Sequence, residues 1–488
     1  MDLIRRVRTG CLALFILALS GLSGCTDVSE RPEFMRSLRE EFKAEEALAK
    51  KEALSAEEEE EKEAEEIVLE TEMPDEQEDA VSAILESCTK EFIGNHLIDD
   101  TFLAWIATEY GGECIVKIAE EVISGRQDAN IWHELTGNSI HVLWLLYCKQ
   151  TGFQQYHLEN VIWKPCASSE ETTLAFTGDI NFSERYVTTR HLDRCENGIY
   201  DCFSQDLLEI MNDVDIMMVN NEFTYSTRGK PLAGKAYTFR ADPSRVELLD
   251  AFGTDIVNLA NNHVYDFGSE ALLDTISVLK EAKMPYVGAG ANIEEASRPC
   301  YFICNGRKIA IVAATQIERS TNYTKEATES TPGVLKTLDA EKFVNVIQKA
   351  KKNSDIVIAF VHWGTEGDSH YGTDQYELAK EFVEAGADAI IGGHTHCLQG
   401  FEIMEEVPII YSLGNFWFSS GTLDTGLATL TIDERGELSM GFIPCIQKSL
   451  KTSLVTDDAE RRRILDFMQE HSAEGILVTE DGMVRREN

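Results

Sequence analysis

The chain is short of positive charge. Lys and Arg number 44 against 85 Asp and Glu, which gives a formal charge of −41 at pH 7. A protein that binds nucleic acid has to neutralise phosphates with Lys and Arg. The charge balance therefore excludes nucleic acid as an expected partner, and an anionic ligand would need a metal ion or a local basic patch.

The sequence also lacks the cysteine spacing that is typical of zinc clusters. None of the ten cysteines after Cys25 shows the repeated CxxC spacing of such clusters, so we expect these thiols to be structural rather than metal-binding. In an oxidising compartment, Cys195 with Cys202 and Cys300 with Cys304 are close enough in sequence to form disulfides. Spacing alone does not determine the connectivity.

The first 25 residues lack an apolar run long enough to cross a membrane comfortably, but they have the features of an export signal. Three arginines precede the apolar run 11–19, and Leu22-Ser23-Gly24-Cys25 resembles the lipobox of bacterial lipoproteins. We therefore predict a signal peptide over 1–24 and a lipid anchor on Cys25, which would hold the mature chain on the extracellular face of the cytoplasmic membrane. The alternatives are an uncleaved signal-anchor helix and a cleaved signal with a chance cysteine.

The rest of the chain divides by composition. Residues 41–80 hold 18 Asp and Glu against 4 Lys, and their apolar residues are too sparse for a buried stripe, so we predict an acidic stalk over 25–77. Helical periodicity between glycine breaks predicts a small all-α domain over 78–165. The chemistry is expected in 172–446, and 447–488 are expected to form a C-terminal tail with one helix.

Between residues 172 and 446, short apolar segments alternate with stretches of helical periodicity. The candidate strands are 174–176, 216–219, 256–259, 309–313, 356–361, 389–391 and 409–411, and the candidate helices include 270–282, 340–351 and 375–385. This alternation predicts an α/β sheet with crossover helices. Ligands in such folds collect at the carboxyl ends of the strands.

Potential metal ligands follow the predicted strands in order. They are Asp179, Glu222 two residues after Asn220, Asn262 beside His263, His362, the pair His394 and His396, and Asn415. A two-metal hydrolytic site needs oxygen and imidazole ligands that converge within a few ångströms, with an acid or base nearby. One such strand end is more often a turn than a ligand, but the whole series predicts a metal site. Because alternate residues of a strand face the same side, His394 and His396 are expected to address one site.

These motifs resemble the calcineurin-like metallophosphoesterase pattern and, within it, the CapA poly-γ-glutamate biosynthesis family. Segment 259–268 resembles that family's Ala-Asn-Asn-His-x-x-Asp-x-Gly, and segment 411–418 resembles its Ser-Leu-Gly-Asn-Phe. The resemblance covers about 172–446. It implies an α/β fold of the layered β-sandwich type, flanked by helices and preceded here by the small all-α domain.

The resemblance also implies roles by position. The metal ligands would be Asp179, Glu222 as the bridging carboxylate, Asn262, His362, His394 and His396. His263 would protonate the leaving group, oriented by Asp266. The pocket would be lined by Asn181, Asn220, Glu366 and Asn415.

Two positions depart from the family pattern. Asn181 stands where the wider phosphoesterase pattern has a histidine, and Glu222 stands in place of an aspartate. An amide oxygen is a poorer ligand for a transition metal than imidazole. We therefore expect one or two divalent ions of the Mn, Zn, Fe or Mg group, and the residues support metal binding more strongly than phosphatase activity.

The resemblance implies a lipid-anchored capsule or poly-γ-glutamate biosynthesis protein with a metal-dependent, hydrolase-like domain. Its partners would be the membrane, an anionic envelope polymer and a polymer synthase or export complex. Two alternatives stay open, a non-catalytic polymer-binding or export component with a degraded metal site and an envelope phosphoesterase. The locally basic stretch 185–240 is either solvated loop or a surface for the carboxylates of the polymer.

Overall fold

A computed structural model describes residues 99–124, 130–152 and 160–487, together with Ile84. The predicted signal peptide, the lipidation site Cys25 and the predicted stalk 25–77 lie outside these residues. Every described residue belongs to one compact unit, which covers 75–488. Among the described residues, no helix has the length and apolar character needed to cross a bilayer.

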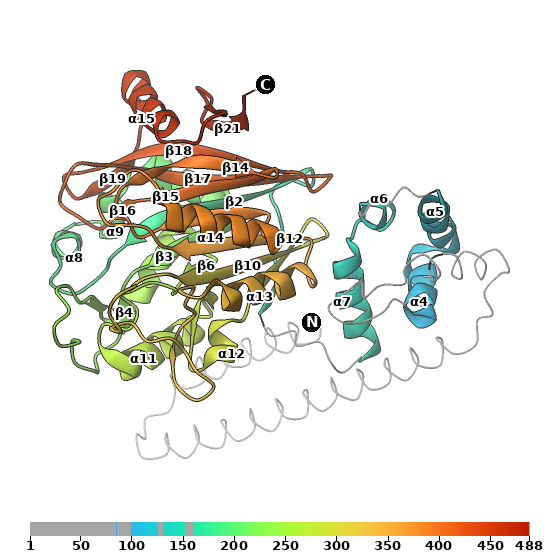
Figure 1. Ribbon diagram of the computed structural model, residues 1–488, viewed down its shortest axis with the longest axis horizontal. Helices are drawn as coiled ribbons and strands as arrows, with labels where there is room; N and C mark the ends of the chain where they lie inside the picture. The colour runs from blue at the N-terminus through green and yellow to red at the C-terminus, as the bar shows by residue number, and fades with distance from the viewer. Residues whose placement is uncertain (1–83, 85–98, 125–129, 153–159, 488) are drawn as a thin grey trace, which may run out of the picture. The chain divides into compact units, whose positions relative to one another are not determined.

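Two large β-sheets form the centre of the described structure (Figure 1). The seven-stranded sheet has the order β1 (Val161–Trp163), β9 (Cys300–Cys304), β10 (Arg307–Thr315), β12 (Ile356–His362), β13 (Ala389–Gly393), β15 (Val407–Leu413) and β14 (Leu398–Met404). The ten-stranded sheet has the order β20 (Ile476–Val478), β21 (Met483–Arg486), β18 (Leu438–Lys448), β17 (Leu423–Asp433), β2 (Glu171–Ile180), β3 (Ile216–Asn221), β6 (Ile256–Asn258) and β7 (Tyr286–Val287), with β16 (Asn415–Trp417) paired to β2 and β19 (Lys451–Leu454) paired to β18. Two small sheets join β4 (Thr224–Tyr225) to β5 (Arg240–Ala241) and β8 (Ala289–Gly290) to β11 (Gly333–Val334).

The main hydrophobic core lies between the two large sheets. Alternate residues of a strand face opposite sides of a sheet, and strand β12 shows this division. Its residues Ile356, Ile358 and Phe360 pack into the core with residues of β2 and β3. The intervening Val357 and Ala359 pack against helices on the other face.

Helices cover the outer faces of both sheets. The seven-stranded sheet packs against α13 (Ala340–Lys351) and α14 (Thr373–Glu384). The outer face of the ten-stranded sheet packs against α10 (Gln205–Asp213), the 3₁₀ segment η2 (Pro243–Phe252) and α11 (Gly268–Glu281), together with the short helices α8 (Val187–Leu192) and α9 (Ile199–Cys202). The short helix α12 (Ile293–Ala296) packs in the cluster on the outer face of the seven-stranded sheet. This arrangement of helices around two stacked sheets confirms the predicted layered α/β sandwich.

Within the described residues, four helices precede the sheets, namely α4 (Asp100–Tyr110), α5 (Gly112–Ile123), α6 (Ile131–Thr136) and α7 (Ile140–Thr151). Val142 and Leu145 of α7 pack against Ile303 of β9. Ser139, which caps α7, donates a 2.5 Å hydrogen bond to Asp355 at the start of β12. These contacts attach the helical segment to the seven-stranded sheet.

Both ends of the predicted α/β region extend beyond the boundaries expected from the sequence. Strand β1 lies inside the range 78–165 assigned to the helical domain, but it pairs with β9 in register Val161 to Tyr301. The range 447–488 contains the expected helix, α15 (Asp458–Glu470), and its strands β20 and β21 join the ten-stranded sheet through β18. These strands could not be predicted from the sequence, because they are short and show little hydrophobic periodicity.

The described cysteines are free thiols. The Cys300–Cys304 disulfide that the sequence spacing allowed does not form, because both residues lie on strand β9, where a rise of about 3.3 Å per residue separates their Cα atoms by roughly 13 Å. A disulfide requires Cα atoms within about 7 Å. Cys195 and Cys202 do meet, with 4.0 Å between their sulfur atoms.

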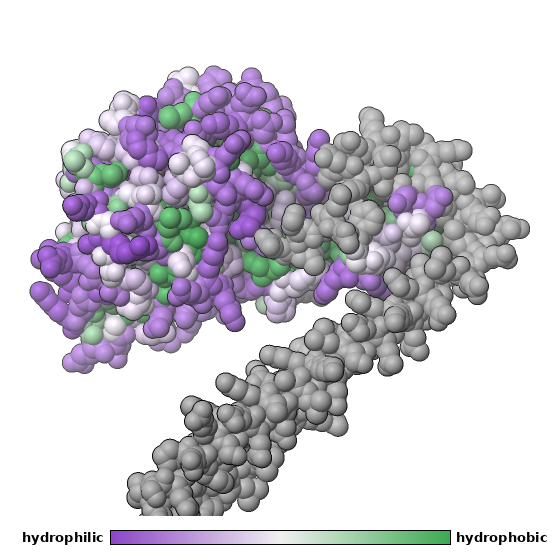
Figure 2. All heavy atoms as spheres, turned by 90° about the horizontal axis from the view of Figure 1, so that it is seen from below, coloured by the Kyte–Doolittle hydropathy of each residue, from purple (hydrophilic) through white to green (hydrophobic). Residues whose placement is uncertain are grey.

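The surface seen in Figure 2 is largely hydrophilic over the described residues. Hydrophobic side chains on this face are scattered rather than gathered into one patch. Isolated apolar side chains of this kind are normal on a folded domain, so this face offers no argument for a particular partner.

Candidate metal centre

The predicted ligands converge at the carboxyl ends of strands from both large sheets. Asp179 lies at the end of β2, Glu222 follows β3 and Asn262 follows β6, and these three strands run parallel in the ten-stranded sheet. The histidines come from the other sheet. His362 ends β12, and His394 and His396 follow β13. The site therefore lies at one edge of the sandwich, where the two sheets meet.

The first group of ligand atoms surrounds the Nε2 atom of His362. This nitrogen is 2.9 Å from Asn262 Oδ1, 3.1 Å from His394 Nδ1 and 3.3 Å from Glu222 Oε1. Two ligands bound about 2.1 Å from one ion, at angles of 90–110°, lie about 3.0–3.4 Å apart. The spacing of these side chains is thus that of atoms sharing one cation.

A second group lies beside the first and shares Glu222 with it. The Nδ1 atom of His396 is 3.1 Å from Asp179 Oδ2 and 2.8 Å from Asn415 Oδ1. Ligand atoms of Asp179, Glu222 and His396 all lie within 4.8 Å of one another, as do those of Glu222, His362 and His394. Glu222 therefore occupies the position between two potential ion sites that the family resemblance implied.

Burial sets the protonation of the histidines. It lowers the pKa of His362 to about 3 and the pKa of His394 well below its ordinary value, so both imidazoles are neutral near pH 7. Burial also favours the neutral form of His396, but the hydrogen bond and charge of Asp179 outweigh it and raise its pKa. Neutral imidazoles have the free electron pair that a metal ion needs.

Glu222 gives the clearest sign that a cation belongs here. Its side chain has no exposed surface, and neither carboxylate oxygen has a hydrogen-bond partner among the described residues. Burial, followed by the negative charge of Asp179, raises its pKa well above the ordinary value. A buried carboxylate without a partner is costly, whereas a divalent ion would satisfy both oxygens. The residues present therefore fit a divalent metal.

His394 and His396 reach the site by a different route from the one predicted. Strand β13 ends at Gly393, so the two histidines do not alternate on an extended strand. Both adopt positive φ angles, 98° at His394 and 61° at His396, which non-glycine residues rarely do. The turn, rather than strand alternation, directs the two rings to different partners, and the predicted geometry was wrong although the predicted residues are together.

His263 lies at the edge of the ligand groups. Its Nδ1 is 2.7 Å from Asp266 Oδ2, and its Nε2 is 4.0 Å from Glu222 Oε1. Burial lowers the pKa of His263, and the charge of Asp266 partly opposes this shift. Asp266 therefore contacts the Nδ1 side of the ring, and Nε2 lies on the side of the ligand groups.

Lys235 is a member of the site that sequence reasoning left within the basic stretch. Its ammonium group lies 2.7 Å from Asp266 Oδ1 and 3.0 Å from Glu318 Oε1, and its side chain is only 7% exposed. It also donates to the carbonyl oxygen of Asn262. No local motif marks this lysine, because its partners come from distant segments.

Asparagines hold the carboxylate of β2 in place. Asn258 donates to Asn220 over 2.8 Å, and Asn220 donates to Asp179 Oδ1 over 2.6 Å. Asn181 is fully buried, and its side-chain oxygen accepts a 2.8 Å hydrogen bond from the backbone of Ser183. The oxygen that would replace the missing histidine ligand therefore already accepts one hydrogen bond within a turn.

The remaining predicted pocket residues differ in position. Asn415 contacts His396, as described above, whereas Glu366 is exposed in the loop after β12. The negative charge of Glu366 contributes to the raised pKa of His396 after the effects of burial and Asp179. It therefore acts at the rim of the site.

Two arginines of the basic stretch have contacts within the protein. Arg228 forms hydrogen bonds with both carboxylate oxygens of Asp274. The guanidinium of Arg240 lies 4.2 Å from the centre of the Phe267 ring. These contacts favour a structural role for these two arginines over an open polymer-binding surface.

Comparison with known proteins places the ligand-bearing strands in one family. A family profile described as "Bacterial capsule synthesis protein PGA_cap" matches residues 173–420. The chain belongs to this family. The PGA_cap match contains every predicted metal ligand from Asp179 to His396, and it confirms the resemblance drawn from the motifs.

Two relatives extend the comparison of the PGA_cap region. The "Capsule biosynthesis protein CapA" of Bacillus anthracis is 32% identical over 252 residues, which cover 50% of this chain and 60% of that protein. The "PGA biosynthesis protein CapA" of Bacillus subtilis (strain 168) is 32% identical over 275 residues, which cover 55% of this chain and 70% of that protein. The match thus spans less than two thirds of the Bacillus anthracis protein.

A crystal structure of a novel phosphatase from Mycoplasma pneumoniae aligns with 57% of this chain and 95% of its own, at 14% identity. The TM-score of 0.37 is too low to carry a conclusion.

Proposed function

We propose that the chain is a lipid-anchored, extracellular component of capsule or poly-γ-glutamate biosynthesis, and that its PGA_cap domain is a metal-dependent hydrolase acting on an anionic envelope polymer. The chemistry is supported chiefly by the convergence of Glu222, His362 and His394 beside the pair of His263 and Asp266. The polymer is suggested by the names of the relatives, a capsule and a PGA biosynthesis protein.

A divalent ion at this position would polarise the bond under attack and lower the pKa of a water molecule. The side chains of the protein would bind this ion and hold the proton that passes to the leaving group. Asp179 and Glu222 contribute negative charge, and the neutral rings of His362 and His394 contribute nitrogen ligands. The whole group is buried, which strengthens each electrostatic contact.

His263 is the proposed proton donor to the leaving group. Its Nε2 faces the ligand groups, and Asp266 accepts the hydrogen bond from Nδ1 over 2.7 Å. A proton held on Nε2 would make an imidazolium, which the carboxylate of Asp266 stabilises. Lys235 balances the charge of Asp266 from the other side.

The proposed location depends on Cys25 and the signal before it. A lipid on Cys25, followed by the stalk 25–77, would hold the domain outside the membrane near a polymer synthase or export complex. Globomycin should block processing of the wild-type chain, and Cys25→Ala should prevent lipidation. Unchanged processing of Cys25→Ala would contradict the anchor.

The activity can be tested on purified protein stripped of metal and then supplied with Mn²⁺, Zn²⁺, Fe²⁺ or Mg²⁺ in turn. We expect metal-dependent cleavage of poly-γ-glutamate, lost in His394→Ala and reduced by about 10²–10⁴-fold in His263→Ala. His370→Ala, which alters a histidine exposed in a surface loop, is the matched control. Release of shorter chains should be measured by size-exclusion chromatography and new amine ends.

The same assay separates the other functions. Cleavage of a generic phosphoester but not of the polymer would replace the proposal by an envelope phosphoesterase. The amide oxygen of Asn181, in the place of a histidine, would be a poorer ligand for a second transition-metal ion, which suits a binding component with a degraded site. Polymer binding without any turnover that depends on His394 would support that role and refute the hydrolase.

A further inference from the structure

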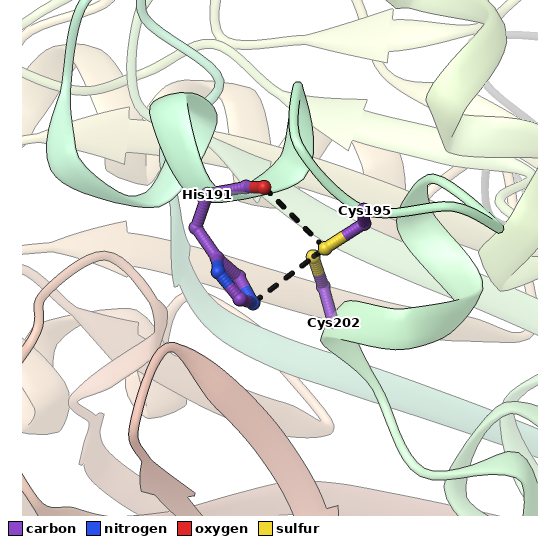
Figure 3. A group of neighbouring side chains, drawn as sticks. All are labelled: His191, Cys195 and Cys202. Carbon is purple, nitrogen blue, oxygen red and sulfur yellow. Dashed lines mark hydrogen bonds between the residues drawn. The ribbon is translucent and has the colours of Figure 1, made fainter.

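A second group of metal-ligating side chains lies away from the centre described above. His191 comes from α8, Cys195 from the turn that follows and Cys202 from the end of α9. The Nε2 atom of His191 is 3.6 Å from the sulfur of Cys195, which is 4.0 Å from the sulfur of Cys202. Figure 3 shows the imidazole and both sulfur atoms directed towards one another.

These separations match a tetrahedral site for a thiophilic ion. Zinc lies about 2.3 Å from thiolate sulfur and about 2.0–2.1 Å from imidazole nitrogen, so tetrahedral angles place two sulfurs about 3.8 Å apart and sulfur and nitrogen about 3.5 Å apart. All three ligand atoms of the group lie within 4.8 Å of one another. A disulfide would need its sulfurs at about 2.05 Å, so the observed spacing is closer to a shared cation than to a covalent bond.

The surroundings allow an ion to enter and be retained. Cys202 is buried, while His191 and Cys195 are half-buried, so the group is covered on one side and reachable on the other. Burial and the neighbouring Cys195 raise the pKa of the Cys202 thiol, which is therefore protonated at neutral pH without a metal. Binding of a divalent ion by the Cys202 sulfur would release this proton.

The segment that carries these residues also supports the metal centre. Thr188, near the start of this segment, donates a hydrogen bond to the carbonyl oxygen of Asn181. Tyr186 packs edge-on against Phe239 and Phe418, with ring centres 5.2 and 5.8 Å away. Those two rings in turn lie 4.4 Å from His263 and 5.0 Å from His396, respectively. Fixing the segment would therefore fix the aromatic wall behind both histidines.

We propose that His191, Cys195 and Cys202 bind one thiophilic divalent cation of the zinc class, and that this ion fastens the segment 187–202 beside the main metal centre. The ligands follow the spacing His-x₃-Cys-x₆-Cys, which lacks the repeated CxxC pattern. The proposal departs from the expectation from sequence that these thiols are structural. Three protein ligands leave one tetrahedral position for water.

The test uses the full-length chain, purified under reducing conditions, stripped of metal and titrated with Co²⁺ as a probe. We expect a thiolate-to-cobalt charge-transfer band in the wild-type protein, which Zn²⁺ removes by displacement. The band should be retained in His394→Ala, which disrupts the main centre, and in Cys114→Ser, a matched control in α5. This separates the second site from failure of the proposed hydrolase.

Cys202→Ser should abolish the band and reduce bound zinc by one equivalent. Because a buried substitution can disturb folding, the half-buried His191→Gln variant provides a second test, and we expect its zinc affinity to fall on the order of 100-fold. Far-UV circular dichroism should confirm that both variants are folded. A wild-type protein without the thiolate band would refute the proposal, and so would a Cys195–Cys202 disulfide that persists under these conditions, seen as the loss of two thiols and of two hydrogens in mass.

Discussion

Replacing Glu222 by glutamine should have opposite effects on the protein with and without metal. Without metal, Glu222 is a buried carboxylate whose oxygens lack hydrogen-bond partners among the described residues, and Asp179 adds a second negative charge. Glutamine removes the charge and keeps the shape. We therefore expect the metal-free Glu222→Gln variant to melt above metal-free wild-type protein at pH 8, and to respond less to metal.

The size of the metal effect follows from binding linkage. An ion present at 100 times its dissociation constant stabilises the folded state by about 2.7 kcal/mol. At about 2.1 cal/mol/K per residue, roughly 330 residues unfold with an entropy of about 0.7 kcal/mol/K, so the melting temperature should rise by about 4 °C. If the variant binds 100-fold more weakly, the same metal concentration contributes only about 0.4 kcal/mol and less than about 1 °C.

The metal-free comparison depends on pH. The pKa of Glu222 is raised in the folded protein, so its contribution to stability is complete below the ordinary glutamate pKa and declines as the pH rises towards the raised value. The advantage of Glu222→Gln should therefore grow as the pH rises above the ordinary glutamate pKa. A charged group costs more than a neutral one when buried without a partner, and a difference of about 1–3 kcal/mol corresponds to about 1–4 °C.

Differential scanning calorimetry of chelator-treated protein, with and without Mn²⁺, measures both effects. Glu377→Gln on α14, an exposed position, is the matched control and should behave as wild type. Two results together would refute the reasoning, namely an unchanged metal-free melting temperature in Glu222→Gln and a full metal-induced rise. The first would show that the carboxylate is not an isolated buried charge, and the second that it is not a ligand.

Two further substitutions test the support of the site. Lys235→Met should destabilise the protein by about 3–5 kcal/mol, because it leaves the buried Asp266 without its cation; urea unfolding should show this loss, and an unchanged midpoint would contradict it. Gly178→Ala should cost about 1–3 kcal/mol or more and weaken metal binding, because the added Cβ would lie 2.0 Å from the carbonyl oxygen of Gly414. Gly372→Ala is its control, since an added Cβ there meets no atom within 4 Å and the stability should change by less than about 0.5 kcal/mol.

Several elements of the fold were predictable because their pattern is local. Helix α13 (Ala340–Lys351) has the bounds expected from its periodicity, and β12 with its alternating faces contains the predicted strand 356–361. Each residue in such an element is selected by burial on one face, so a window of a few residues contains the signal. Strands β1, β20 and β21 are short and partly exposed, and only pairing with a neighbour marks them as strands.

The candidate metal site shows the same division. The convergence of the candidate ligands could be predicted because they stand at or shortly after the ends of apolar strands, and parallel strands bring their carboxyl ends to one edge. The directions of the His394 and His396 side chains could not be predicted. Both residues have positive φ angles in a tight turn, and long-range packing maintains the geometry of that turn. Lys235 was missed as a site residue for a related reason, since its two carboxylate partners lie 31 and 83 positions further along the chain.

The sequence by itself thus determined the alternation of strands and helices, the order of the metal-ligating residues and the family. These features depend on neighbours within a few positions, or on residue types that metal chemistry demands. Only the tertiary structure decided that two separate sheets share the site, that Glu222 lies between both groups of ligands, and that His191, Cys195 and Cys202 meet. The physical reason is that such meetings depend on how whole sheets and loops pack, and packing joins residues whose separation along the chain contains no repeating signal.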